Sequence, residues 1–197
     1  MATPLIMARW PQLIKTVPAI EKIGGTLLYV GANRNRHHYM PELHDMGYEV
    51  TVLEVWEPNL KEIAQKEMVH RAVLGNACKV DEYDLGENMF DVSFWWHGPE
   101  HVDAAGFAQA LFRLERITRK LIILGSPWGN YTQGAVKGNP FEEHVRPVLP
   151  EHYEAFGYKT VTLGTKDVID SNSLAWKPLS AQSRRRSANM DKWIASL

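Results

Sequence analysis

The chain has little of several features that mark specialised classes of protein. Cys78 is the only cysteine among 197 residues, so no disulfide can form within the chain, and a reducing, cytoplasmic location is expected. The formal net charge of −1 creates no overall field toward nucleic acid or an anionic membrane. No apolar run reaches the ~18 residues of a membrane span. Pro4, Arg9 and Pro11 interrupt the N-terminal apolar patch, so a signal peptide is not expected.

Length and composition indicate one globular domain. The content of 45% hydrophobic and 23% charged residues is ordinary, and the length suffices for one substantial core. We expect an N-terminal helical segment over residues 1–25, a core over 26–178 and a tail over 179–197. The basic run from Arg184 to Arg186 indicates a solvated or interface segment, with nucleic-acid contact as the weaker alternative. The sequence leaves homo-oligomerisation open.

The first strong local pattern is a buried strand that ends in glycine. Residues 27–30 are an apolar run suited to a strand covered on both faces, as in a parallel sheet. Gly31 allows a sharp bend and a close approach of a ligand to the backbone. A helix is expected from about Arg36 to Met46. Strand, glycine turn and helix open the doubly wound nucleotide-binding folds, in which the ligand lies over the turn. The alternative is a buried strand that merely ends in glycine.

Two further strand ends carry polar side chains. The expected second strand, Tyr48–Glu54, ends in an acid about 20 residues after Gly31, where a carboxylate is placed to accept hydrogen bonds from ribose hydroxyls. A solvent-exposed strand-end acid is the alternative. A third strand over 72–74 is followed by Gly75 and Asn76. The Asn76 amide could hydrogen-bond an adenine amino group, or Asn76 could be a plain turn residue.

The rest of the chain predicts alternating helices and strands. Strands are expected over 89–96, 120–125, 158–164 and 171–176, and the last two should pair antiparallel because they are close in sequence. Helices are expected over 57–68 and 102–118, and over 141–156 with breaks at Pro147 and Pro150. The loop over 130–139 is long enough to be a lid or a substrate wall.

In this order, the motifs resemble those of the class I S-adenosylmethionine-dependent methyltransferases, over about residues 27–177. The resemblance is carried by residues 28–32 as the glycine motif, Glu54 as the ribose acid and residues 75–77 at the adenine position. Glu100 and His101 fill the place of an acidic-histidine pair after the fourth strand. Residues 126–129 resemble the turn after the fifth strand. The late Asn139, Glu142 and His144, followed by residues 156–158, are similar to a segment that closes over substrate.

The resemblance implies a fold, a reaction and a set of site residues. The fold would be a Rossmann-like, doubly wound and mostly parallel seven-stranded sheet with an antiparallel last strand and helices on both faces. The reaction would be methyl transfer from S-adenosylmethionine to oxygen or nitrogen of a small molecule, such as a sugar-like or natural-product-like acceptor. The cofactor would contact Gly31, Ala32, Asn33, Glu54, Val55, Gly75, Asn76, Ala77 and Trp96, and the acceptor would contact Glu100, Ser126, Trp128 and Tyr131.

The chain departs from the family pattern at several positions. The pattern usually has an acid where Tyr29 stands, glycines where Asn33 and Asn35 stand, and often an acid in place of Asn76. A dinucleotide would need those glycines for its pyrophosphate, whereas S-adenosylmethionine has no phosphate. Arg34, Arg36 or backbone N–H groups could hold its carboxylate, although the two arginines also leave a phosphate ligand open. The degenerate motif keeps a second hypothesis open, namely a non-catalytic binding or scaffold protein with the same fold.

Histidines are the candidate bases for a hydroxyl acceptor, because their pKa lies near neutrality. We favour His101 or His144, with His97 as a third candidate; a packing or capping role is the alternative for each. Trp95, Trp96 and Trp128 could frame the sulfonium or the acceptor, with core packing as the alternative for Trp95.

A zinc-binding motif at residues 97–101 is a weaker hypothesis than the methyltransferase site. The segment matches His-x-x-Glu-His, which needs a continuous helix to bring both imidazoles onto one face. Gly98 and Pro99 oppose that helix, and no metal is predicted.

Overall fold

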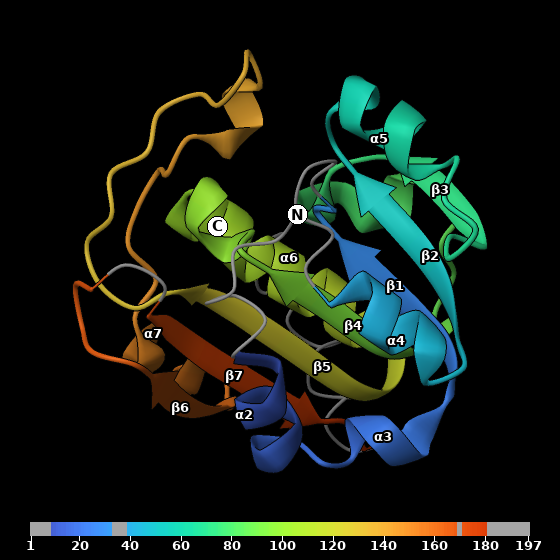
Figure 1. Ribbon diagram of the computed structural model, residues 1–197, viewed down its shortest axis with the longest axis horizontal. Coiled ribbons are helices and arrows are strands. Elements are labelled where there is room, and N and C mark those ends of the chain that lie inside the picture. The colour runs from blue at the N-terminus through green and yellow to red at the C-terminus, as the bar shows by residue number, and fades with distance from the viewer. Residues whose placement is uncertain (1–8, 33–38, 169–170, 181–197) are drawn as a thin grey trace, which may run out of the picture.

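The chain folds around one seven-stranded sheet (Figure 1). The computed structural model describes residues 9–32, 39–168 and 171–180. The strand order is β3-β2-β1-β4-β5-β7-β6. β7 pairs antiparallel with β5 and β6, while the pairs among β1 to β5 are parallel. This confirms the predicted sheet and its antiparallel last strand. The strands are β1 Gly25–Val30, β2 Tyr48–Glu54, β3 Arg71–Leu74, β4 Phe90–Trp96, β5 Thr118–Pro127, β6 Lys159–Leu163 and β7 Asn172–Pro178.

Helices cover both faces of the sheet. One face packs against side chains from α2 Arg9–Thr16, α3 Ile20–Ile23, α4 Met40–Asp45 and α5 Glu57–Ile63. The other packs against the 3-10 helix η1 Ala77–Glu82, the long helix α6 Ala104–Ile117 and the short α7 Pro150–Glu154. Two more 3-10 turns, η2 Pro99–His101 and η3 Pro140–Glu142, lie outside these layers. The predicted strands and α6 are confirmed to within a few residues.

In the N-terminal helical segment, the described residues form two helices, α2 and α3, with Pro18 between them. Two helix predictions need correction. The helix expected over 57–68 ends at Ile63. The helix expected over 141–156 is replaced by the short elements η3 and α7. The N–H groups of Val145 and Arg146 donate to the Glu100 carbonyl, so they make no hydrogen bonds within a helix. The expected start of the helix near Arg36 lies outside the described residues.

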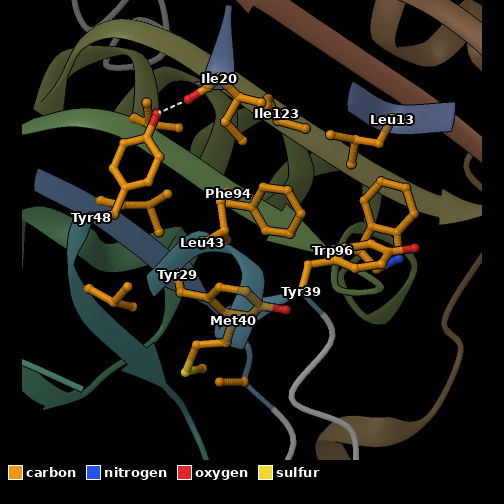
Figure 2. Packing of buried hydrophobic residues seen from close by; sticks show 14 of the residues in the cluster. Leu13, Ile20, Tyr29, Tyr39, Met40, Leu43, Tyr48, Phe94, Trp96 and Ile123 are labelled. Atoms are coloured by element: carbon orange, nitrogen blue, oxygen red, sulfur yellow. Dashed lines mark hydrogen bonds between the residues drawn. The ribbon is translucent and has the colours of Figure 1, made fainter. Parts of the chain in front are cut away.

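Residues of the central strands enter two separate cores. In β1, Leu27 and Tyr29 face the α2–α5 layer, and Leu28 and Val30 face the α6 layer. The first core is rich in aromatic side chains from β1, β2 and β4 and from Tyr39, which precedes α4, as Figure 2 shows. The ring of Tyr39 meets that of Trp96 edge-on at 5.3 Å. Trp95 points into the other core, so the adjacent tryptophans face opposite ways, as strand geometry requires.

An ion-pair network closes the amino ends of β1, β4 and β5. The buried Asp91 carboxylate accepts hydrogen bonds from the Thr26 N–H at 3.1 Å and from Nη2 of Arg119 at 2.8 Å, and it pairs with Nζ of Lys120 at 3.0 Å. The hydrogen bond from Arg119 is the main reason that the pKa of Asp91 lies well below its usual value. We call Thr26, Asp91, Arg119 and Lys120 the amino-end anchor. It satisfies a buried charge entirely within the fold.

Candidate active site

A cleft of about 830 Å³ lies at the opposite edge of the sheet, where the parallel strands end. That volume falls within the ~300–1,000 Å³ typical of small-molecule sites. Gly31 follows β1, Glu54 ends β2, Asn76 follows β3 and His97 follows β4, and all four line the cleft. The expected convergence of strand ends is therefore confirmed. It follows from topology, because the carboxyl ends of parallel strands share one edge of a sheet.

Glu54 is a buried carboxylate at the cleft wall. It is 4% exposed, and its Oε1 accepts a hydrogen bond from the Trp56 N–H at 2.8 Å. Burial raises the pKa of Glu54 from 4.5 to about 7, because the Trp56 N–H offsets only part of the desolvation. A carboxylate that is kept from water but given few partners is suited to accept hydrogen bonds from a ligand.

Glycines next to the strand ends leave room for aromatic rings. A Cβ at Gly98 would lie 1.7 Å from Nε1 of Trp95, and a Cβ at Gly75 would lie 2.6 Å from the Tyr83 ring. Gly31 has a φ of +71°, which other residues rarely adopt. Glycine is therefore required at these turns for packing and backbone shape as much as for ligand approach.

Asn76 caps a 3-10 helix as well as lining the cleft. Its Oδ1 accepts from the Cys78 N–H at 2.8 Å, and its own N–H donates to the Tyr83 hydroxyl at 3.0 Å. The turn role considered in the sequence is therefore present. The carbonyl oxygen has a second lone pair, so the cap does not exclude a ligand contact.

The turn after β4 places a histidine against a buried acid. His97 has a φ of +52°, unusual for a non-glycine residue, and its N–H donates to the Gly125 carbonyl at 2.8 Å. Nδ1 of His97 lies 3.2 Å from Oε1 of Glu100, which is 2% exposed. Burial by itself raises the pKa of Glu100, but the hydrogen bond from His97 and the nearby His101 outweigh it, so the pKa is lowered.

The segment 128–149, which we call the arm, forms the far wall of the cleft and rises above the strand ends in Figure 1. Its two legs are tied together, since the His144 N–H donates to the Gln133 carbonyl at 2.8 Å. The returning leg docks on η2, where the Val145 N–H donates to the Glu100 carbonyl at 2.9 Å. The predicted substrate wall at 130–139 is thus the first leg of a longer structure.

The arm brings His144 beside His101. The two rings lie 5.0 Å apart between centroids. Nδ1 of His101 is 2.9 Å from the Glu143 carbonyl oxygen, and Nδ1 of His144 is 2.9 Å from the Tyr131 carbonyl oxygen. A carbonyl can only accept, so Nδ1 of each ring carries a proton, and the neutral tautomer that this favours has its lone pair on Nε2.

Most of the predicted site residues line the cleft. These are Gly31, Glu54, Val55, Gly75, Asn76, Ala77, Trp96, His97, Glu100, His101, Tyr131 and His144.

Three predicted residues lie elsewhere. Ser126 is fully buried, and its hydroxyl donates to the Val148 carbonyl and accepts from the Tyr153 hydroxyl, so it is committed within the fold. Ala32 is buried and, like Trp128, is not among the lining residues. Asn33, together with Arg34 and Arg36, lies outside the described residues.

Several lining residues were not predicted. The arm supplies Gln133, Val136, Lys137 and Phe141, and Ser171 comes from the segment before β7. The only sequence signal for the arm residues was the length of their loop. No helix in the described ranges has the length and apolar character to span a membrane.

Solved structures share this fold at low sequence identity. NodS, an N-methyltransferase from Bradyrhizobium japonicum WM9, matches with a TM-score of 0.64 and 12% identity over 90% of this chain and 97% of that chain. The 1,6-didemethyltoxoflavin-N1-methyltransferase of Burkholderia thailandensis, with bound S-adenosylhomocysteine, matches with a TM-score of 0.61 and 17% identity over 91% and 80%. The magnesium protoporphyrin IX methyltransferase of Synechocystis PCC 6803, with bound SAM, matches with a TM-score of 0.57 and 12% identity. The match covers 91% of this chain and 86% of that chain.

These likenesses define the class of the fold. The chain has the class I, Rossmann-like methyltransferase fold, as its sequence motifs predicted. No family model matches the sequence, and no curated protein matches it.

Proposed function

We propose that the chain is an S-adenosylmethionine-dependent methyltransferase that acts on oxygen or nitrogen of a small-molecule acceptor. The observation that carries the proposal is the meeting of Gly31, Glu54, Asn76 and the His97 turn in one cleft. Structures of this fold have been solved with SAM or S-adenosylhomocysteine, as in the Synechocystis and Burkholderia proteins. The acceptor would be small, because it would share a cleft of about 830 Å³ with the cofactor.

The strand ends fit the cofactor. Glu54 would accept hydrogen bonds from the ribose hydroxyls, which its few partners and its burial favour. Residues 75–77 would lie beside the adenine, and the Gly31 turn beside the methionine part. When bound, S-adenosylmethionine supplies a methyl group that its sulfonium has already activated. The protein then needs only to hold the acceptor in line and exclude water.

The arm side of the cleft would hold the acceptor. His101 and His144 each present an Nε2 lone pair there, so either could accept the acceptor's proton as its oxygen or nitrogen bonds to the methyl carbon. His97 is less suited, because its Nδ1–H is engaged with Glu100. This ordering of the candidate bases follows the sequence-based preference.

Calorimetry with the full chain tests the cofactor assignment. S-adenosylmethionine and S-adenosylhomocysteine should each bind once per chain, and NAD should not bind. No heat with either adenosyl compound would refute the assignment. Heat with NAD alone would indicate a dinucleotide site instead.

A non-catalytic scaffold is the second candidate. It is favoured by Tyr29, which stands where the family usually has an acid and is fully buried in the core. A screen of hydroxyl and amine acceptors that measures release of S-adenosylhomocysteine separates the two. Turnover with any acceptor supports the enzyme, whereas tight binding without turnover across the screen supports the scaffold. A cytoplasmic location, the absence of a nucleic-acid partner and the oligomeric state stay predictions from the sequence; light scattering measures the last.

A further inference from the structure

We propose that Glu100, His101 and His144 form a binding site for one divalent transition-metal ion, with Zn²⁺ as the ion to test. One potential ligand atom from each of the three side chains lies within 4.8 Å of the other two. All three residues line the arm side of the cleft. The set joins two distant segments, since η2 provides Glu100 and His101 and the arm provides His144.

The two histidines are already in the tautomer that binds metal. Each Nδ1–H donates to a backbone carbonyl at 2.9 Å, from Glu143 for His101 and from Tyr131 for His144. Hydrogen bonds of this kind orient metal-binding imidazoles in known sites and make Nε2 a better ligand. Nε2 of His101 also points toward the acid, at 3.9 Å from Oε1 of Glu100.

Glu100 has a buried oxygen with no hydrogen-bond partner. Oε1 faces Nδ1 of His97 at 3.2 Å, but no donor among the described residues contacts Oε2, although the side chain is only 2% exposed. A buried carboxylate oxygen without a donor is costly, and a cation would remove that cost. His97 would act as the positioning residue, because its hydrogen bond fixes the orientation of the carboxylate.

The donor set selects among metals. Two imidazoles and one carboxylate suit Zn²⁺, Fe²⁺ or Mn²⁺, whereas Mg²⁺ and Ca²⁺ prefer oxygen ligands alone. Three protein ligands leave a fourth position open, as in zinc sites that perform chemistry. At bond lengths of 2.0–2.1 Å, tetrahedral ligand atoms stand roughly 3.3 Å apart. The side chains would thus move together by small rotations on binding, and no backbone rearrangement is needed.

The helix argument against zinc does not apply to this set. It concerned His97 and His101 on one continuous helix, and η2 is only a short 3-10 turn. The third ligand comes instead from a residue more than 40 positions later, which no local motif contains.

The open position would give the metal a role in methyl transfer, and this step rests on the proposed function. A hydroxyl oxygen of the acceptor would bind there, and the cation would lower its pKa. Its proton would then pass to water, because Nε2 of His101 and of His144 would bind the metal and neither histidine would act as the base. The oxygen–methyl bond then forms as the methyl–sulfur bond breaks, and the sulfonium becomes a neutral thioether. The site therefore predicts an oxygen acceptor rather than nitrogen.

Metal titration of the full chain tests the site without any substrate. After treatment with a chelator and its removal, calorimetry should show one Zn²⁺ bound per chain. His101→Ala, His144→Ala and Glu100→Gln should each weaken binding by about 100-fold or more, and His97→Ala by about tenfold. His70→Ala is the matched control, because His70 is exposed and outside the cleft, and it should bind as the wild type does.

Cobalt gives a second readout that does not depend on activity. Co²⁺ bound at this site should show visible absorption bands of a four- or five-coordinate ion, and His144→Ala should abolish them. Circular dichroism checks that each variant is folded. His144 belongs to neither core, so His144→Ala should stay folded and test the site even if Glu100→Gln unfolds.

The outcomes separate the site from the proposed function. Absence of Zn²⁺ binding, or binding that His101→Ala and His144→Ala leave unchanged, would overturn the metal site even if S-adenosylmethionine binds. Stoichiometric Zn²⁺ binding that both variants remove would support the metal site even if S-adenosylmethionine fails to bind. In that second case the proposed methyltransferase function would be refuted and the metal site would be kept.

Discussion

The two ends of the same parallel strands carry buried acids in opposite surroundings. At the amino ends, Asp91 has a backbone N–H, Arg119 and Lys120 as partners, and its pKa is held well below the usual value. At the carboxyl ends, Glu54 has the Trp56 N–H as its hydrogen-bond donor, and burial raises its pKa to about 7. Glu100, also at the carboxyl ends, keeps one oxygen without a hydrogen-bond partner.

The difference separates a charge that stabilises the fold from a charge reserved for a ligand. A buried carboxylate costs free energy unless hydrogen bonds and opposite charge compensate it. The amino-end anchor supplies that compensation within the chain. The carboxyl ends do not, so the compensation there must come from what binds. Perturbed carboxylates in a cleft are typical of functional sites for this reason.

Removal of the Glu54 carboxylate should have the largest effect, and on ligand affinity. Glu54→Ala should weaken S-adenosylmethionine binding by about 10- to 100-fold, because hydrogen bonds to a charged group contribute ~1.5–3 kcal/mol. Calorimetry measures this directly. Glu49→Ala, an exposed acid on the same strand, is the control. If both variants bind equally well, the ribose role of Glu54 is wrong.

Removal of the Asp91 carboxylate should have the next largest effect, and on stability. Asp91→Ala should lower the free energy of unfolding by about 2 kcal/mol. This lies below the cost for a fully buried pair, because Arg119 and Lys120 are 42% and 53% exposed and water screens them. Urea denaturation measures the loss. S-adenosylmethionine affinity should not change, and a change would mean that the two ends are coupled.

The two acids should also give opposite dependences on pH. The raised pKa of Glu54 means that the ligand-free protein favours its neutral form, so its contribution to stability is lost as pH rises from 4.5 toward 7. The lowered pKa of Asp91 makes its contribution present above the unfolded value of about 4 and lost as pH falls below it.

Ligand binding should report the Glu54 titration. If the ionised carboxylate binds ribose, S-adenosylmethionine affinity should rise about tenfold from pH 6 to pH 8, because most of the carboxyl is protonated at pH 6. Glu54→Gln should remove this dependence and should also be more stable than the wild type at pH 8 without ligand. An equally steep dependence in Glu54→Gln would assign the titration to another group.

The smallest effect should come from Lys120. Its ammonium pairs with Asp91 at 3.0 Å but is half exposed, and Arg119 already donates two hydrogen bonds to that carboxylate. Lys120→Ala should therefore cost less than about 1 kcal/mol in urea denaturation. A loss as large as that of Asp91→Ala would show that Lys120, rather than Arg119, holds the anchor together.

The sequence predicted the strand ends well because their signals are local. β1 contains an apolar run at residues 27–30 that ends in Gly31, and Tyr48–Glu54 is rich in β-branched and apolar residues. Topology alone then brings Gly31, Glu54 and Asn76 to one edge of the sheet. The arm could not be predicted in this way. Its shape depends on long-range backbone hydrogen bonds, such as those from Val145 and Arg146 to Glu100, which no periodicity encodes.

The same limit explains the errors at single residues. Ser126 was expected in the site because it follows a strand, but Tyr153 from α7 takes up its hydroxyl. The sequence predicted His101 or His144 as the base, as alternatives. Only the arm shows that they lie side by side and that Glu100 completes the set.

The arm also gives the two walls of the cleft different resistance to local opening. The strand-end wall belongs to the sheet and to two cores, whereas residues 130–146 of the arm are held mainly by hydrogen bonds and expose Val136, Phe141 and Val145. Segments with few buried contacts open at a lower free energy than the whole fold. Amide hydrogens at 133–146 should therefore exchange with solvent sooner than those of β1 and β4. A molecule in the cleft could leave by a brief opening of the arm while the sheet stays folded.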